Sequence, residues 1–390
     1  MDRFLPMQSV VADSYEKPAS CADAVTISCY DNEIPSFVAT EIDRLYQHLG
    51  CSLSNFSVMK KLAGASTYVA RKGTVIVTVL LFRRERNQVT VLSEFIRLDQ
   101  AAVQLFANTM FNKFSAVRMV SFNKIHTEVR RMPYPYQSVN CTEDIVVMLP
   151  QTVKQYQDQL GKNMRRNIKR YGATLQQDFP SYHYQVYLEQ QVSEADIRAI
   201  IKLNRSRMAG KKIVSRIDEE ETQWIVRLVR QCGIVGVAKI DGQVCGGAIG
   251  FRIGENYFMH VIAHDPVYNS YSLGILCYYL TICEGIVRGG KRFHLSWGRY
   301  EYKYRLLGET VDIAQLKLYR NRAYAVLYGY SISKAVLSDY ARRSKLWLLE
   351  AERRDGQIAH LAAKLMRVLR TLKRSNMGGL LNNHSAEKAG

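Results

Sequence analysis

The sequence lacks an uncharged apolar run of the roughly 18 to 20 residues that a membrane-spanning helix requires. Its beginning, MDRFLPMQSVVADSYEK, lacks the sustained apolar core of a secretory signal peptide. Its eight cysteines form none of the close pairs that zinc ribbons and thioredoxin-like sites use. These absences predict a cytoplasmic protein with buried thiols and no metal site, and they leave open peripheral contact with the inner face of a membrane.

Acidic residues are scarce relative to basic ones, because 35 Asp and Glu stand against 54 Lys and Arg and give a net charge of +19. Such a charge favours partners that carry phosphate, but it does not distinguish a nucleotide cofactor, a nucleic acid and an anionic lipid. Low-complexity tracts and short repeats are also missing. A chain of 390 residues that is 47% hydrophobic suits two globular domains.

The predicted elements divide the chain near Pro133 and Pro135, which break any helix or central strand. After a tail over 1–30, we expect an N-terminal domain over 31–140 and a C-terminal domain over 141–346. The N-terminal domain is expected to contain a helix near 36–49, β segments over 66–73, 74–85 and 87–98, a helix over 99–111 and a strand over 115–122.

The C-terminal domain repeats a similar order. It is expected to contain a strand over 143–150, helices over 152–171, 193–208 and 218–231, strands near 174–179 and 183–189, and a meander of 233–240, 243–253 and 256–265. An apolar helix ending at Gly289-Gly290, strands over 291–297 and 312–320, and helices over 322–346 and 347–374 complete the prediction. Residues 347–390 are interpreted as a basic amphipathic helix and a tail.

The stretch LGKNMRRNIKRY over 160–171 has five positive charges and no acid. On a helix, Leu160, Met164, Ile168 and Tyr171 fall in one sector and the charges fall across the opposite side. The helix is therefore amphipathic, and its apolar side predicts packing against a domain. Its charges fit either a solvated face or a landing surface for an anionic donor or substrate.

Three strings resemble the GNAT acyltransferase superfamily, in the branch of CelD-like acetyltransferases related to Fem peptidyltransferases. They are LGKNMRRNIKRYGATL from 160, DPVY followed by YSLGILCYYL from 265 and 271, and WGRYEYKYR from 297. The resemblance implies an α/β (α+β) protein of two tandem GNAT-like domains, each with a mixed, mainly antiparallel sheet flanked by helices. It also implies acyl-CoA as co-substrate, bound by the second domain.

The loop over 269–274 leads into the apolar helix, whose first turn has unpaired N–H groups that suit a pyrophosphate. The resemblance places cofactor binding there, and the predicted residues are Tyr271, Ser272, Leu273, Gly274 and Arg305. A glycine at a helix start is equally compatible with an ordinary structural start. Leu273 stands where the branch usually has proline, and the longer glycine-rich phosphate loop of common acetyltransferases is absent.

Acyl transfer to an amine requires a base near neutral pKa, which favours histidine. Strand alternation predicts that Phe258, His260, Ile262 and His264 share one face, with His260 as a candidate base or as a packed, hydrogen-bonded histidine. His294 is the second candidate, since it lies where many members of the branch have aspartate. Arg299 and Tyr300 also replace an acidic pair of that branch.

Tyr302, Lys303 and Arg305 are the remaining candidates. If this segment is extended, Lys303 and Arg305 point together toward cofactor phosphates or a developing oxyanion, and otherwise they are solvated surface charges. Tyr302 is a candidate proton donor to the leaving thiolate.

The favoured prediction is an acyl-CoA-dependent N-acyltransferase acting on an amine-bearing small molecule or glycan precursor, such as one of the cell envelope or of an exopolysaccharide. One alternative is a Fem-like transferase that uses aminoacyl-tRNA, for which the charge is suitable. The other is a non-catalytic GNAT-fold protein that binds nucleic acid or an anionic membrane, the latter through the leucine-striped basic stretch over 361–374. The sequence leaves the oligomeric state open.

Overall fold

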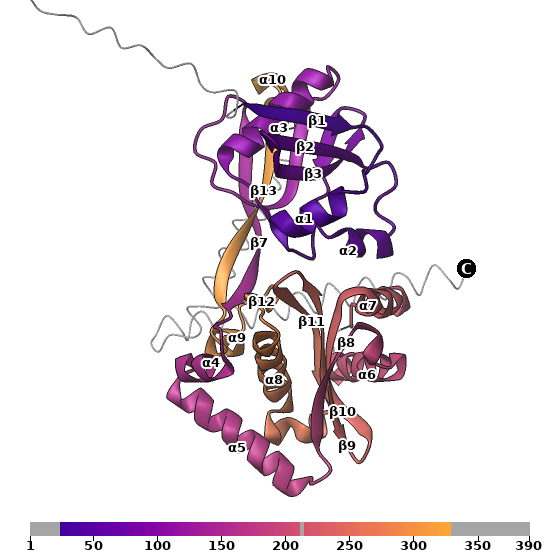
Figure 1. Cartoon of the computed structure of the whole chain (residues 1–390), viewed down its shortest axis with the longest axis vertical. Helices are drawn as coiled ribbons and strands as arrows, with labels where there is room; N and C mark the ends of the chain where they lie inside the picture. The colour runs from indigo at the N-terminus through magenta and orange to yellow at the C-terminus, as the bar shows by residue number, and fades with distance from the viewer. Residues whose placement is uncertain (1–23, 211–213, 329–390) are drawn as a thin grey trace, which may run out of the picture.

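The computed structural model describes residues 24–210 and 214–328, which form two lobes joined by long strands (Figure 1). The first repeat of elements is β1 (Val25–Tyr30), α1 (Val38–Tyr46), α2 (Leu53–Val58), β2 (Ser66–Lys72), β3 (Val75–Glu85), β4 (Gln88–Val91), β5 (Ile96–Arg97), α3 (Gln100–Lys113), β6 (Met119–His126) and β7 (Tyr136–Met148).

Two helices, α4 (Val153–Gln159) and α5 (Lys162–Asp178), connect this repeat to the second. The second repeat is β8 (His183–Leu188), the 3-10 helix η2 (Glu189–Gln191), α6 (Glu194–Gly210), α7 (Glu219–Cys232), β9 (Gly233–Ile240), β10 (Gln243–Ile253), β11 (Asn256–His264), the 3-10 helix η3 (Pro266–Tyr271), α8 (Leu273–Val287), β12 (Arg292–His294), α9 (Glu301–Arg305) and β13 (Glu309–Tyr319). The short helix α10 (Arg322–Leu327) follows.

The strands of the described residues form one sheet in the order β1-β2-β3-β4-β6-β13-β7-β12-β11-β10-β9-β8, with β5 beside β6. Each repeat has an antiparallel set of strands and then one parallel pair, β4 with β6 and β11 with β12. The last strand of each repeat crosses to the other one, since β13 pairs with β6 and β7 pairs with β12. Strands β7 and β13 also pair with each other and join the lobes (Figure 1).

The two parallel pairs differ in a way that matters for a binding site. In the first repeat, β5 continues the pairing with β6, and Phe95 N–H donates to the Lys124 carbonyl, so the gap between the strands is closed. In the second repeat, β11 and β12 pair only as far as Phe258 and His294, after which β11 continues to His264 with β10 on one side and without β12 on the other. Only the second repeat is therefore open between its parallel strands in this part of the chain.

Three groups of buried apolar side chains fix this arrangement. The first fills the upper lobe of Figure 1 around Phe82, Phe106 and Phe122. In the second lobe, α8 and α5 pack on one side of the sheet, and α6 and α7 pack on the other. Burial of these side chains contributes about 25 cal/mol for each Å² of apolar surface removed from water.

Most of the predicted elements are confirmed, including the helices over 193–208 and 218–231 and the three-stranded meander. The strand predicted near 174–179 is wrong, because α5 runs on to Asp178 with Leu175 buried. The segment after Pro135 does not interrupt the secondary structure as predicted, since central strand β7 begins at Tyr136. The predicted boundary at 140/141 falls within β7.

The predictions for the tail over 1–23 and for helices beyond 328, including the basic helix over 347–390, lie outside the described residues. No helix in the described ranges is long and apolar enough to cross a membrane.

Candidate functional site

The two lobes enclose a pocket of about 360 Å³ between them, next to the point where β11 and β12 separate. Both predicted candidate bases line it, together with side chains of the first lobe. The polar and charged lining residues are His48, Asn55, Lys61, Glu94, Lys124, Thr142, Glu143, Asp144, Glu221, His260, His294 and Ser296.

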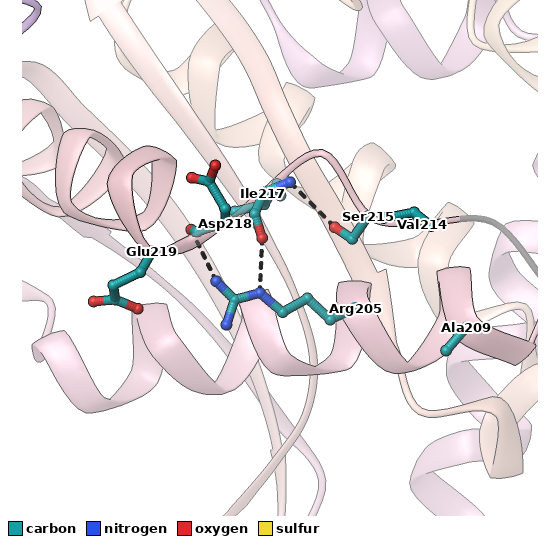
Figure 2. Close-up of a pocket in the computed structure, with 7 residues that line it drawn as sticks. All are labelled: Arg205, Ala209, Val214, Ser215, Ile217, Asp218 and Glu219. Carbon is teal, nitrogen blue, oxygen red and sulfur yellow. Dashed lines mark hydrogen bonds between the residues drawn. The ribbon is translucent and has the colours of Figure 1, made fainter. Parts of the chain in front are cut away.

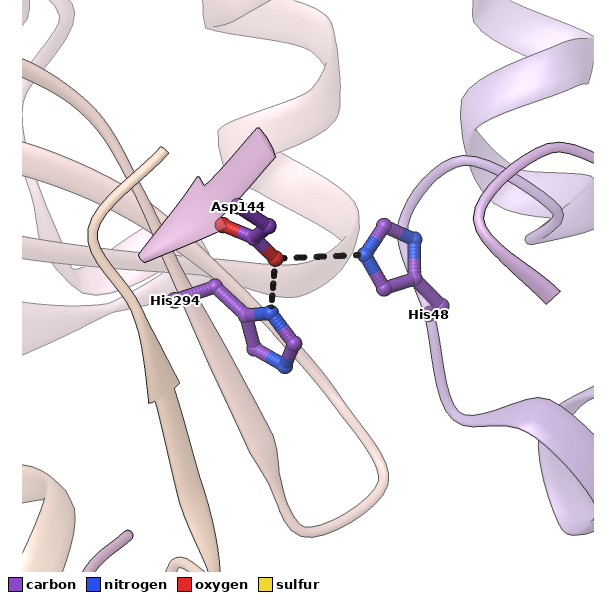
Figure 3. A group of neighbouring side chains, drawn as sticks. All are labelled: His48, Asp144 and His294. Carbon is purple, nitrogen blue, oxygen red and sulfur yellow. Dashed lines mark hydrogen bonds and ion pairs between the residues drawn. The ribbon is translucent and has the colours of Figure 1, made fainter. Parts of the chain in front are cut away.

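His294 and Asp144 are brought together by the pairing of β12 with β7. His294 lies opposite Val146, so that Asp144, two residues earlier on the same face of β7, is its diagonal neighbour. The His294 Nδ1 to Asp144 Oδ2 distance is 2.5 Å, and both residues are more than nine-tenths buried (Figure 3). The imidazole ring also stacks on Phe258, with 4.3 Å between ring centroids. The orientation of His294 is thus fixed from two sides.

This pairing determines which nitrogen of His294 is available for chemistry. An ionised carboxylate accepts hydrogen bonds only, so Nδ1 carries the proton and donates to Asp144. The hydrogen bond from His294 and the nearby ring of His48 hold the pKa of Asp144 far below its usual range, against the opposing effect of burial. Within the described residues, His294 Nε2 is buried and has no hydrogen-bond partner. In neutral imidazole this atom has a lone pair, as a general base requires.

A second histidine, His48, reaches Asp144 from the first lobe. It lies between α1 and α2, and its Nε2 is 4.0 Å from Asp144 Oδ2 (Figure 3). Its Nδ1 accepts a hydrogen bond from the Gly50 N–H at 2.9 Å. Burial lowers the pKa of His48 to about 4, so the ring is neutral at neutral pH and its proton lies on Nε2.

The ligand-type atoms of His48, Asp144 and His294 lie within 4.8 Å of one another, as in some metal sites. The hydrogen bonds do not fit that role. A histidine ligand normally donates its second ring N–H to an acceptor, whereas His48 Nδ1 accepts from Gly50 and leaves the proton on the nitrogen facing Asp144. The cluster is better described as two imidazole donors on one carboxylate.

His260 lies in the same pocket, but the prediction that it shares one face of β11 with Ile262 and His264 is wrong. Gly250 pairs with Met259 and Ile249 pairs with Val261, so His260 is the extra residue of a β-bulge. The bulge turns His260 toward α7, where its Nε2 lies 3.2 Å from Glu221 Oε1 and its ring meets Trp224 edge-on.

Beyond the bulge, Ile262 and His264 point to the α8 side of the sheet, where His264 Nδ1 would lie 2.9 Å from a Cβ atom on Gly274. Gly274 therefore provides space for this ring. The packing of this ring explains the glycine without a bound phosphate.

The segment with Lys303 and Arg305 is helix α9, so the prediction that these two side chains point together along an extended chain is wrong. Lys303 is 3% exposed and donates to the carbonyl oxygens of Ser296 and Trp297 at 2.9 and 2.7 Å. Burial lowers its pKa to about 8. Arg305 is exposed and pairs with Glu301 at 2.6 Å. Lys303 therefore holds the turn that follows β12, and Arg305 faces α5.

A second pocket, of about 260 Å³, lies on the open side of β11 beyond the bulge. Its lining residues are Arg207, Ile262, His264, Asn269, Ser272, Gly274, Ile275, Tyr278 and Tyr302. Three predicted residues, Ser272, Gly274 and Tyr302, thus come together beside the N-terminus of α8, which has no side-chain cap.

Three predicted cofactor residues do not line this second pocket. Leu273 is fully buried in the core, and the Tyr271 hydroxyl donates to Asp178 Oδ2 at 2.8 Å. The predicted Arg305 lines a separate cleft beside Arg166, at the start of α5.

A third pocket lies between the end of α6 and the start of α7 (Figure 2). Its cation, Arg205, donates to the carbonyls of Ile217 and Asp218 and to Thr222 Oγ1, each at 2.8 Å. These bonds use the guanidinium to fasten the loop before α7 onto α6. The pocket therefore has a structural explanation and is not a candidate active site.

Comparison with known proteins identifies the second lobe. Residues 162–304 match the model of the acetyltransferase (GNAT) domain. This part of the chain is a GNAT domain. The open parallel pair, the bulge and the helix that starts beside them all lie within residues 162–304, and the family that these residues match is one of acetyltransferases.

Solved structures with the same arrangement include that of FemX, which is 7% identical with a TM-score of 0.57 and covers 76% of this chain and 98% of its own. This likeness shows that the shared fold extends over both lobes, in agreement with the predicted tandem architecture.

Two further structures align more loosely. L-PGS from Bacillus licheniformis is 10% identical with a TM-score of 0.45 and covers 78% of this chain and 97% of its own. A tandem GNAT protein from the clavulanic acid biosynthesis pathway is 11% identical with a TM-score of 0.39 and covers 76% and 98%. No curated protein matches the sequence.

Proposed function

We propose that this protein transfers an acyl group from an acyl-CoA thioester to a primary amine, with the thioester in the pocket beside α8 and the amine in the pocket between the lobes. The two pockets lie along successive residues of β11, from Phe258 to His264, where β12 no longer covers the strand. An acyl group placed at this opening could be reached from both sides.

The observation that carries the proposal is the state of His294 Nε2. Among the described residues it is a buried nitrogen without a hydrogen-bond partner, on a ring that Asp144 holds at 2.5 Å and in a residue that lines the pocket between the lobes. A general base needs a lone pair, a fixed orientation and a partner that stabilises the protonated ring, and His294 has all three. His260, bonded to Glu221 at the wall of the same pocket, is the second candidate.

In the proposed reaction the amine nitrogen attacks the thioester carbon while its proton passes to His294 Nε2. A C–N bond forms, the C–S bond breaks, and the thiolate takes a proton to leave as a thiol. Tyr302 is the proposed donor of that proton, since it lines the donor pocket and burial raises its pKa, which keeps its hydroxyl protonated. Lys303 acts only by holding the turn at Ser296 and Trp297.

The donor pocket suits the narrow arm of a thioester better than a large group. Ile262, Ile275, Tyr278 and Tyr302 supply apolar walls, and Arg207 supplies a positive charge. We propose that the pantetheine part of acyl-CoA lies along these walls. Acyl-CoA would supply an activated carbonyl, and the residues of this chain would orient it.

The acceptor pocket combines aromatic side chains with carboxylates. Phe95, Trp224 and Phe258 line it, Glu221 is near its wall, and Trp297 is 61% exposed. A partly apolar molecule with a protonatable amine fits this lining. Amine-bearing glycan precursors of the envelope or of an exopolysaccharide remain the proposed class, with Trp297 as a flat surface for a ring, and the site of action is proposed to be the cytoplasm.

The experiment is a turnover assay with purified full-length protein, acetyl-CoA or a long-chain acyl-CoA, and a panel of amines that includes amino sugars. Free thiol should appear only when both substrates are present, and His294→Ala should reduce the rate by about 100- to 10,000-fold. Thiol release that is unaffected by His294→Ala but lost in His260→Ala would transfer the role of base to His260. No thiol release with any pair would refute acyl-CoA dependence.

A second candidate donor is aminoacyl-tRNA, which one feature of the structure favours. Lys162, Arg166 and Lys169 on the exposed side of α5 have no ion-pair partner among the described residues. Phosphate contacts dominate nucleic-acid affinity, so a triple charge reversal at these positions should abolish a salt-dependent gel shift with tRNA. Thermal shifts with acetyl-CoA and with tRNA, measured side by side, distinguish the two donors.

A further inference from the structure

His48 lies in the first lobe, far in sequence from the GNAT domain, yet its ring lies beside the hydrogen-bonded pair of Asp144 and His294. Its Nε2–H is directed toward the same oxygen of Asp144 that accepts from His294 (Figure 3). Its ring meets His294 edge-on, with 5.2 Å between centroids, and stacks on Phe95 at 4.8 Å.

Gly50 explains why His48 adopts this orientation. Its N–H donates to His48 Nδ1, and a Cβ atom at this position would lie 2.7 Å from Phe95 Cδ2 and 3.0 Å from the Glu94 carbonyl. A larger residue would therefore push the chain away from Phe95 and remove the bond to His48. The glycine and the bond together fix the tautomer of His48 with its proton on Nε2.

Hydrogen bonds from both sides fasten the segment that carries His48 to the second lobe. The Asn256 side chain donates to the Gln47 carbonyl at 2.9 Å, and the Glu255 N–H donates to Gln47 Oε1 at 3.1 Å. On the other side, Trp224 Nε1 donates to Asn55 Oδ1 at 3.2 Å. The first lobe thus presents His48 to the GNAT domain at a fixed place.

We infer that His48 is a positioning residue for acyl transfer, which orients the Asp144 carboxylate and through it His294, so that the site is incomplete without the first lobe. This inference rests on the proposed function. The distance of 4.0 Å is about 1 Å longer than a hydrogen bond, and such bonds commonly shorten when substrate closes a site. A donor on the second flank of Asp144 reduces the freedom of the carboxylate to rotate away from His294.

Two substitutions distinguish the roles of the two ring nitrogens of His48. The amide of His48→Gln places a donor near the position of Nε2, and the amide of His48→Asn places an acceptor near Nδ1 and leaves nothing to reach Asp144. His183→Asn, on the exposed edge strand β8, is the matched control.

We expect His48→Asn to lower kcat by about 10- to 100-fold with little change in KM for the acyl donor, and His48→Gln to recover most of the loss. The other charged groups facing this cluster are Glu143 on β7, Lys124 on β6 and Lys303 on α9, and they are the same in all three variants.

A readout without substrate makes the test independent of the proposed function. Histidine ring ¹⁵N NMR on the full chain should show His48 protonated on Nε2 and His294 protonated on Nδ1, with the His294 signals displaced in His48→Asn and unchanged in His183→Asn. Unchanged His294 signals, or a wild-type kcat in His48→Asn, would overturn the inference. Absence of turnover in the wild type with displaced His294 signals would refute the proposed function alone.

Discussion

His294 Nδ1 and Asp144 Oδ2 lie 2.5 Å apart although 150 residues separate them in the chain. The contact exists because β7, the last strand of the first repeat, crosses to pair with β12 of the second. Exchange of the last strands therefore does more than join the lobes. It brings Asp144 of β7 beside His294 in the GNAT domain. His294 stands at the position of β12 where the resemblance implies an acidic residue.

Asp144→Asn tests the importance of that charge. An amide of the same shape can still contact His294, but it cannot stabilise the protonated ring, so we expect kcat to fall by about 100-fold or more with a smaller change in KM. The measurement is steady-state thiol release. Asp158→Asn, on the exposed side of α4 and paired with Lys154, should stay within about threefold of the wild type. Equal losses in both variants would indicate a general effect on the protein.

Lys303 should make the free energy of unfolding rise with pH in the alkaline range. Its pKa is about 8 in the folded protein against 10.5 as a free side chain. Between these values the unfolded state binds more protons than the folded state, so the free energy of unfolding should rise with pH, by at most about 3 kcal/mol, and should show no contribution of this kind below pH 8.

The comparison for Lys303 is Lys303→Met, which keeps the length of the side chain and removes the titration. Urea unfolding of both proteins between pH 7 and 10 gives the difference between their free energies of unfolding at each pH. A difference that stays constant across this range would show that Lys303 keeps its ordinary proton affinity in the folded state. Loss of the bonds to Ser296 and Trp297 should lower the stability of Lys303→Met by an amount that does not vary with pH below 8.

The sequence predicted much of the fold because its patterns are local. The apolar side of 160–171 is confirmed, with Leu160 and Met164 buried and all five charges exposed. The strand prediction for TLQQDF is wrong because its two apolar residues, Leu175 and Phe179, stand four apart, which is the spacing of a helix, and Leu175 lies on the buried side of α5.

The site was predictable only in part. His294 was found through a resemblance, and the bulge at His260 could not be read from alternation, which it interrupts. His48, Asp144 and Glu221 were missed because their roles depend on pairing between distant segments. A signal existed for Glu221, which lies in the acid-rich first turn of a helix that begins at Glu219, but acids are common there for reasons of the helix dipole.

Ile262→Trp tests the donor pocket by filling it. Ile262 is half-buried and lines a space of about 260 Å³ with Tyr278 and Tyr302. We expect the rise in melting temperature caused by acetyl-CoA to disappear, while the melting temperature without ligand changes by only a few degrees. Val75→Trp, at a site 57% exposed in the first lobe, is the control and should keep the ligand-induced shift. A retained shift in Ile262→Trp would place the donor elsewhere.

Two glycine substitutions should change stability in opposite directions. A Cβ atom on Gly236 would lie 1.8 Å from the Tyr184 hydroxyl, which bonds Thr281 and the Cys277 carbonyl and so ties β8 to α8. Gly236→Ala should therefore lower the free energy of unfolding by about 2 to 4 kcal/mol. Gly172 lies inside α5 with nothing within 4 Å of its Cβ position, so Gly172→Ala should raise it by about 0.5 to 1 kcal/mol. Urea unfolding of both variants checks the two signs, and a Gly236→Ala protein as stable as the wild type would contradict the close packing of β9 under Tyr184.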